Sequence, residues 1–109
     1  MSTTPDYVEF AASQIADCGI VRYRKMFGEY MVYVNDKPIL LVCDNSVYVK
    51  IMPCLDDLMT GAEKGYPYDG AKEHYILDID NADLAMAVVT ALEAVTPLPI
   101  PKPKPKKRK

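Results

Sequence analysis

The 109-residue chain has few of the residues from which catalytic and metal sites are usually built. It contains one histidine, His74, and three cysteines, Cys18, Cys43 and Cys54, an odd number without any C-x-x-C pair. Such a set favours neither a disulfide framework nor a zinc ribbon. We therefore expect reduced thiols, no metal and no cofactor, in a protein of the cytoplasm.

Long apolar segments and phosphate-binding glycine loops are also missing. The chain begins Met-Ser-Thr-Thr-Pro-Asp, without a basic segment followed by an apolar run. No stretch approaches the ~18 consecutive apolar residues of a membrane-spanning helix. No glycine-rich loop follows a candidate strand. We expect neither secretion nor membrane insertion.

Charge is divided unevenly along the chain. Residues 1–95 hold seven Lys or Arg against fifteen Asp or Glu, a net charge of −8, whereas residues 96–109 hold six cations and no acid. Five prolines at alternating positions in this last stretch prevent regular hydrogen bonding and favour extended polyproline II. The sequence predicts a domain over residues 1–95 and a flexible basic tail over residues 96–109.

Turn signals and hydrophobic spacing predict an α+β fold built on an antiparallel meander sheet. Helices are expected over residues 5–18 and 82–95, and each follows a capping residue, Thr4 or Asn81. Two-residue links, Asn35-Asp36 and Asp44-Asn45, predict hairpins. Strands are expected over residues 21–27, 30–34, 37–43, 46–51 and 73–78, with a short middle helix over 54–59 and an irregular segment over 65–70.

Two of the expected strands carry apolar side chains on both faces. Tyr30, Val32 and Val34 alternate with Met31 and Tyr33, while Leu40 and Val42 alternate with Ile39, Leu41 and Cys43. An antiparallel sheet with one solvated face would alternate apolar with polar residues instead. Either helices cover both faces or one face meets another subunit. Because only two substantial helices are expected, we predict a homodimer.

Four segments stand at a distinctive spacing: Arg24-Lys25-Met26-Phe27-Gly28, then Tyr30 to Lys37, then Val47-Tyr48-Val49-Lys50, then Gly65-Tyr66-Pro67-Tyr68. Together they resemble the N-terminal domain of the TfoX (Sxy) family of competence regulators, over roughly residues 5–95. The resemblance implies a helix, an antiparallel sheet, a helix, further strands and a final helix. It also implies a role in regulation or protein association more than in catalysis.

This chain departs from the family at two places. Members of the regulator branch add a C-terminal domain where this chain has only its tail. Glu29 stands where the family often has another glycine, which makes the turn after Gly28 conformationally tighter.

Three cations, Arg22, Arg24 and Lys25, lie beside the Met26-Phe27-Gly28 turn and stand out against a body of net charge −8. They could hold an acidic partner or a phosphate backbone. We predict partner binding through these cations and Phe27. The alternative is that they only protect an edge strand from mispairing.

The tail carries six further cations, and these are candidates for non-specific contact with nucleic acid. If all six met duplex phosphates, the salt dependence of binding would have a slope as steep as about −5. No aromatic residue is interleaved with them, which disfavours single-strand recognition. The alternative is a solubilising end. The residues are Lys102, Lys104, Lys106, Lys107, Arg108 and Lys109.

Catalysis has little support in the sequence. His74 lies between Glu73 and Tyr75 in an expected strand, and no motif selects a cysteine nucleophile to pair with it. We predict a non-enzymatic domain that binds another macromolecule. The alternative is a small-molecule-binding module or an enzyme whose pocket uses His74 and the Tyr66-Pro67-Tyr68 loop.

Overall fold

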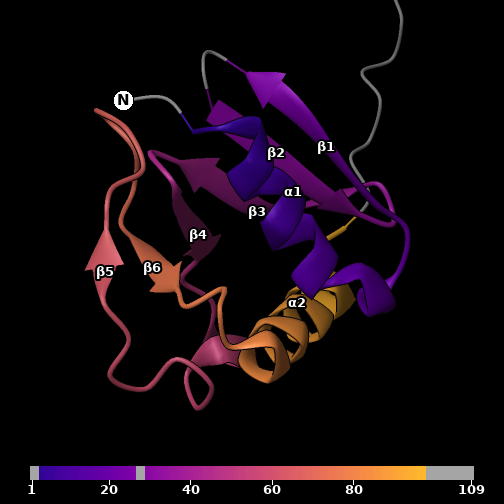
Figure 1. The fold of residues 1–109 in the computed structure, drawn as a ribbon. Coiled ribbons are helices and arrows are strands. Elements are labelled where there is room, and N and C mark those ends of the chain that lie inside the picture. Colours follow the sequence, from indigo (N-terminus) through magenta and orange to yellow (C-terminus); the bar gives the residue numbers. More distant parts are fainter. Residues whose placement is uncertain (1–2, 27–28, 98–109) are drawn as a thin grey trace, which may run out of the picture.

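One six-stranded antiparallel sheet organises the chain, and the computed structural model describes residues 3–26 and 29–97 of it (Figure 1). The spatial order of the strands is β1-β2-β3-β4-β6-β5. The predicted α+β fold with an antiparallel meander is confirmed. The strands are β1 (Val21–Met26), β2 (Glu29–Val34), β3 (Lys37–Cys43), β4 (Ser46–Lys50), β5 (Lys64–Gly65) and β6 (His74–Leu77), and the helices are α1 (Pro5–Gln14) and α2 (Ala82–Val95).

Two tight hairpins hold β2, β3 and β4 together. Asn35, Asp36, Asp44 and Asn45 have φ values of 52°, 68°, 55° and 56°. Asn and Asp adopt this left-handed conformation more readily than other side chains, so the chain can reverse within two residues. Both predicted two-residue links are confirmed.

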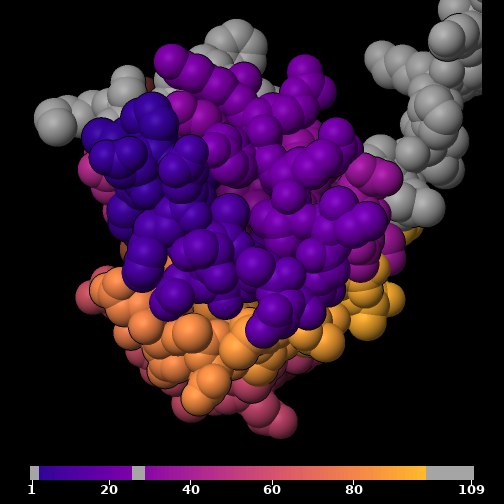
Figure 2. Space-filling view, turned by 45° about the vertical axis from the view of Figure 1, so that its right-hand side comes forward, coloured from indigo at the N-terminus to yellow at the C-terminus, as the bar shows by residue number. Residues whose placement is uncertain are grey.

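Both helices lie on the same face of the sheet (Figure 1), and in Figure 2 the indigo α1 segment packs beside the orange and yellow α2. Their apolar sides form one core with alternate residues of the strands. The buried members from the helices are Val8, Ala11, Ala85, Val88, Val89 and Leu92, and those from the sheet include Tyr30, Val32, Val34, Leu40, Val42, Val47, Val49, Tyr75 and Leu77.

Side-chain caps begin both helices as predicted. Thr4 Oγ1 accepts a hydrogen bond from the Tyr7 N–H at 3.3 Å, and Asn81 Oδ1 accepts one from the Leu84 N–H at 3.1 Å. These bonds satisfy N–H groups that have no partner within the first helical turn. The bounds predicted for α2 match those of the structure.

Two helices are shorter in the structure than the sequence predicted. The first ends at Gln14, because Ile15 leaves the helical conformation with φ −117° and turns its fully buried side chain into the core; a 3₁₀ turn, η1 (Ala16–Cys18), follows. The middle helix over 54–59 is only a 3₁₀ turn, η2 (Pro53–Leu55). A single buried pair, Leu55 and Met59, is too little apolar surface to support a longer helix there.

An ion pair fastens the end of α2 to the β2–β3 hairpin. Lys37 Nζ donates to the Glu93 backbone carbonyl at 2.9 Å and lies 3.0 Å from Glu93 Oε2, to which Asn35 Nδ2 also donates at 3.5 Å. The hydrogen bonds from Lys37 and Asn35 lower the pKa of the Glu93 carboxyl below its ordinary value.

Replacing this carboxylate should destabilise the protein in a pH-dependent way. A folded-state pKa below the unfolded value of about 4.3 gives stability that is complete above that pH and is lost as the pH falls through the folded pKa. We expect Glu93→Gln to lower the thermal midpoint at pH 7, and the difference from wild type to shrink as the pH falls below the unfolded-state value of about 4.3. Thermal unfolding followed by circular dichroism across this range measures both.

Glu73→Gln is the matched control, because Glu73 is exposed and has no ion pair within the described ranges 3–26 and 29–97. Its effect should stay within about 0.5 kcal/mol at every pH. A Glu93→Gln difference that does not diminish as the pH is lowered below about 4.3 would contradict the assignment.

Candidate interaction surface

The second face of the sheet has no helix over it in the part of the chain that the structure describes (Figure 1). Its side chains come from alternate positions of the strands, and we call this surface the open face. Its apolar members are half-buried, which leaves part of each in contact with solvent. They are Met31 and Tyr33 on β2, Leu41 on β3, Tyr48 on β4 and Ile76 on β6.

The register of the strands places one residue from each along a line across the open face. Arg24 pairs with Met31, Met31 with Leu41, Leu41 with Tyr48, and Tyr48 with Ile76. The Ile76 N–H donates to the Glu63 carbonyl at 2.8 Å, which adds Glu63 at the far end. We call these six residues the central row.

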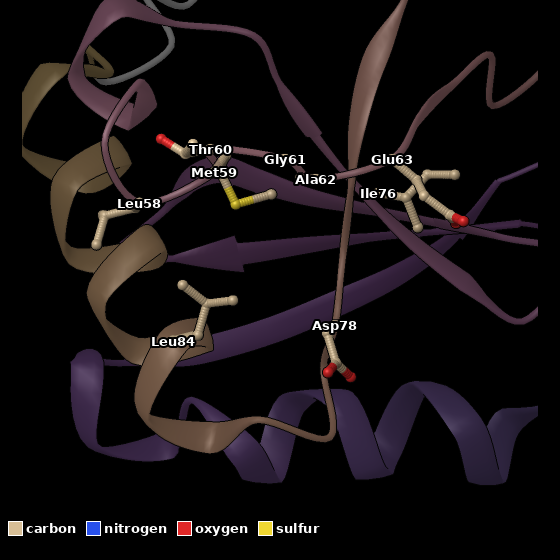
Figure 3. Close-up of a pocket in the computed structure, with 9 residues that line it drawn as sticks. All are labelled: Leu58, Met59, Thr60, Gly61, Ala62, Glu63, Ile76, Asp78 and Leu84. Carbon is tan, nitrogen blue, oxygen red and sulfur yellow. The ribbon is translucent and has the colours of Figure 1, made fainter.

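The orientations of the neighbouring residues place the Glu63 side chain on the open face. Lys64 places Nζ 5.7 Å from the centre of the Tyr75 ring, a buried side chain of the helix-covered face. Residues 63 and 65 therefore point the other way. A Cβ on Gly65 would lie 3.2 Å from Cδ1 of Ile76, an open-face side chain. Figure 3 shows Glu63 and Ile76 on the same side of β6, across the strand from Leu84.

The central row has opposite charges at its two ends. It begins with the exposed cation Arg24, passes through four apolar or aromatic side chains and ends with the exposed carboxylate of Glu63. Neither charged side chain has an ion pair within residues 3–26 and 29–97. The adjacent row, which includes Tyr30, Val42 and Val47, faces the helices and is buried.

A pocket of about 420 Å³ lies beside the Glu63 end of the row, between β6 and the start of α2 (Figure 3). Its apolar wall includes Leu58, Met59 and Leu84, and its carboxylates are Glu63 and Asp78. Asp78 Oδ1 accepts a hydrogen bond from the Asp80 N–H at 3.2 Å. The pocket adds negative charge to this edge of the open face.

The structure divides the cations predicted as one cluster. Arg22 and Arg24 share a face with their cross-strand partners Tyr33 and Met31, whereas Lys25 pairs with Tyr30 and lies toward the helix-covered side. Arg22 is in an ion pair with Asp36. Of the three, Arg24 alone is an unpaired cation on the open face among the described residues. Phe27 and the tail cations Lys102–Lys109 lie outside the described residues.

His74 and the tyrosines of the 66–68 loop, which were the candidates for a ligand pocket, do not line the cavity beside β6. His74 Nδ1 lies 2.7 Å from the Lys72 carbonyl, and Tyr66 and Tyr68 are 64% and 58% exposed. None of the three lines that cavity. Among residues 3–26 and 29–97, no three side chains of His, Cys, Asp or Glu are grouped so that they could hold a metal ion.

The cysteines differ sharply in accessibility. Cys43 is 1% exposed, and its burial, reinforced by the nearby Glu29 carboxylate, raises the pKa of its thiol to about 12. It is therefore a protonated thiol at neutral pH and a poor nucleophile. Cys54 is exposed, and Cys18 is half-buried.

This difference predicts the order in which the thiols react. At pH 8, iodoacetamide should label Cys54 first, while Cys43 should stay unlabelled until the protein unfolds, because its thiolate is absent and its sulfur is covered. Peptide mass spectrometry after timed labelling measures each site. In denaturant all three cysteines should react at similar rates, and native-state labelling of Cys43 ahead of Cys54 would contradict the structure.

Glu63 was not identified from the sequence. It lies before a two-residue strand in a segment without alternating hydrophobicity, and only its backbone pairing with Ile76 brings it to the open face. In the described part of the chain, no helix is both long and apolar enough to cross a bilayer.

Comparison with known proteins connects this sheet to a family. Residues 13–82, which contain all six strands, match the family model described as TfoX N-terminal domain. The chain is also 35% identical over 103 residues to an uncharacterised 12.7 kDa protein in the trpE 5′ region of Spirochaeta aurantia. That alignment covers 89% of this chain and 90% of the relative.

Proposed function

Because this chain belongs to the TfoX N-terminal domain family, we propose that it is a non-enzymatic domain of the cytoplasm that binds another protein through the open face of its sheet. The observation that carries this proposal is the central row. Four apolar or aromatic side chains stand in line across four neighbouring strands, β2, β3, β4 and β6, with no helix of the described chain above them.

The composition of the open face is that of a protein-binding surface. Met, Tyr and Arg are enriched at interfaces, and the row contains one of each, together with Leu41 and Ile76. Covering apolar surface stabilises a complex by about 25 cal/mol for each Å² removed from water. A flat, half-exposed apolar sheet therefore gains more from a partner than from solvent.

The edge of the sheet is less suited to binding than its face. β1 is an edge strand and carries Arg22, Arg24 and Lys25 in succession with Tyr23. Positive charges on an exposed strand disfavour pairing with a strand from another chain. A partner is therefore expected on the flat surface and not as an added strand.

The absence of catalysis is also part of this proposal. Cys43 is buried with a raised thiol pKa, and His74 hydrogen-bonds to a backbone carbonyl two residues away. Neither arrangement activates a nucleophile. The free cysteines support a reducing compartment. Contact of the basic tail with nucleic acid stays a prediction, because those residues lie outside the described part of the chain.

A charge placed at the apolar centre of the row should weaken binding. We expect Leu41→Glu to weaken association with the partner at least tenfold, which corresponds to about 1.4 kcal/mol, because the carboxylate would have to be desolvated in an apolar interface. The measurement is quantitative capture from a native lysate on immobilised protein, followed by mass spectrometry.

Phe10→Glu is the matched control, since Phe10 is 39% exposed on α1 at the opposite side of the molecule. It should retain every protein that the wild type captures. Thermal unfolding must show both variants folded. Undiminished capture by a folded Leu41→Glu variant would refute binding through the open face.

A further inference from the structure

We infer that the protein bound by the open face is a second copy of this chain, packed face to face about a two-fold axis that runs parallel to the strands. This inference rests on the proposed function and names the partner. It comes from the order of charges along the central row, which is complementary to itself when reversed.

The row reads Arg24, Met31, Leu41, Tyr48, Ile76 and Glu63 from the β1 edge to the β5 edge. When the row of a second copy is laid over it in the reversed order, Glu63 lies opposite Arg24 at each end, and every apolar or aromatic residue lies opposite another one. The two charged ends are five strand spacings apart, about 24 Å. The same surface on two copies is therefore complementary in charge and in apolar character, as an isologous interface requires.

A two-fold axis between two stacked sheets and parallel to their strands exchanges the two edges. The β1 edge of one copy then lies over the β5 edge of the other. In this arrangement Arg24 faces Glu63 of the second copy, Met31 faces Ile76, and Leu41 faces Tyr48. Stacked sheets lie about 10 Å apart, a gap that extended arginine and glutamate side chains can span together.

The other simple axis is disfavoured by charge. A two-fold axis perpendicular to the strands would stack each β1 on the β1 of the second copy, so that the cations of this strand approach one another. Like charges in that position cost free energy without compensation. The polarity of the row thus selects one orientation of the pair.

Two carboxylates at the rim do not oppose this arrangement. Glu29 accepts hydrogen bonds from Thr3 Oγ1 and from the Asp44 N–H, and Asp78 accepts one from the Asp80 N–H. Both lie at strand ends, outside the central row. Asp78 also adds negative charge near Glu63, which strengthens the attraction for Arg24 of the second copy.

The area available predicts a dimer of modest affinity. The open face measures about 24 Å across the strands and about 17 Å along them, which is about 400 Å² on each copy and puts the dimer among weak, transient interfaces. Association should therefore depend on protein concentration over the micromolar range.

Charge reversal at the two ends of the row tests the inference. Arg24→Glu and Glu63→Arg should each weaken the dimer at least tenfold, because each brings like charges together at both ends of the interface. An equimolar mixture of the two variants should dimerise again, since every contact in the mixed pair joins opposite charges. The double variant R24E/E63R should also dimerise. Sedimentation velocity over roughly a hundredfold range of concentration measures all of these species.

Lys25→Glu is the matched control, because Lys25 is the exposed neighbour of Arg24 on the helix-covered side. It should dimerise as the wild type does. If a charge reversal prevents folding, Arg24→Gln and Glu63→Gln replace the pair, and each should weaken the dimer by a smaller factor.

The outcomes separate this inference from the proposed function. A wild type that stays monomeric at all concentrations, while Leu41→Glu still loses a captured protein, overturns the second copy as partner and leaves binding through the open face intact. If Arg24→Glu does not change the dimer affinity, the two-fold arrangement is wrong. It is also wrong if the two single variants do not associate with each other on mixing.

Discussion

The alternation of side chains along a β-strand is the constraint on which this molecule depends. Each strand sends half of its residues to either face, and both helices pack on one of them. Val32, Val42 and Val47 on that face are completely buried, whereas Met31, Leu41 and Tyr48 beside them are not. Both faces of the sheet are apolar, but in residues 3–26 and 29–97 the helices cover only one of them. Within this described part of the chain, an apolar surface is therefore left without a helix over it.

The hairpin turns give this surface its order. Two pairs of left-handed residues, Asn35-Asp36 and Asp44-Asn45, fix how β2, β3 and β4 align. A slip of one residue in either hairpin would exchange the two faces of a strand and destroy the core, so the register is strongly determined. The same register aligns Met31, Leu41 and Tyr48 across the open face. Polar turns at the ends of these strands thus decide which apolar side chains stand beside one another in the central row.

Charge and reactivity are distributed in a way that suits association. Two ionisable groups with a shifted pKa have structural roles: Glu93 pairs with Lys37 at the end of α2, and Cys43 is buried and protonated. The charges left free of ion pairs among the described residues of the central row are at its two ends, Arg24 and Glu63. Free charges around an apolar centre set the orientation of a partner more than the strength of its binding.

Local signals in the sequence determined most of the elements. Capping by Thr4 and Asn81, the apolar spacing of residues 82–95 and the two Asn/Asp links each act within a few residues, and each is present in the structure. Alternation also showed that both faces of β2 and β3 are apolar. The lengths predicted for the first and middle helices were wrong. The first ends where Ile15 turns into the core, and the middle one has too little buried apolar surface to extend beyond a single 3₁₀ turn.

Only the tertiary structure decided which face of the sheet is covered and which charged residues lie at the ends of the central row on the other face. Arg24 and Lys25 are adjacent in sequence and lie on opposite faces, whereas Arg24 and Glu63 are far apart in sequence and end the same row. Glu63 reaches that row through the pairing of β5 with β6, across a loop that carries no hairpin signal. Such pairings depend on backbone hydrogen bonds between distant segments, and side-chain patterns within one segment do not encode them.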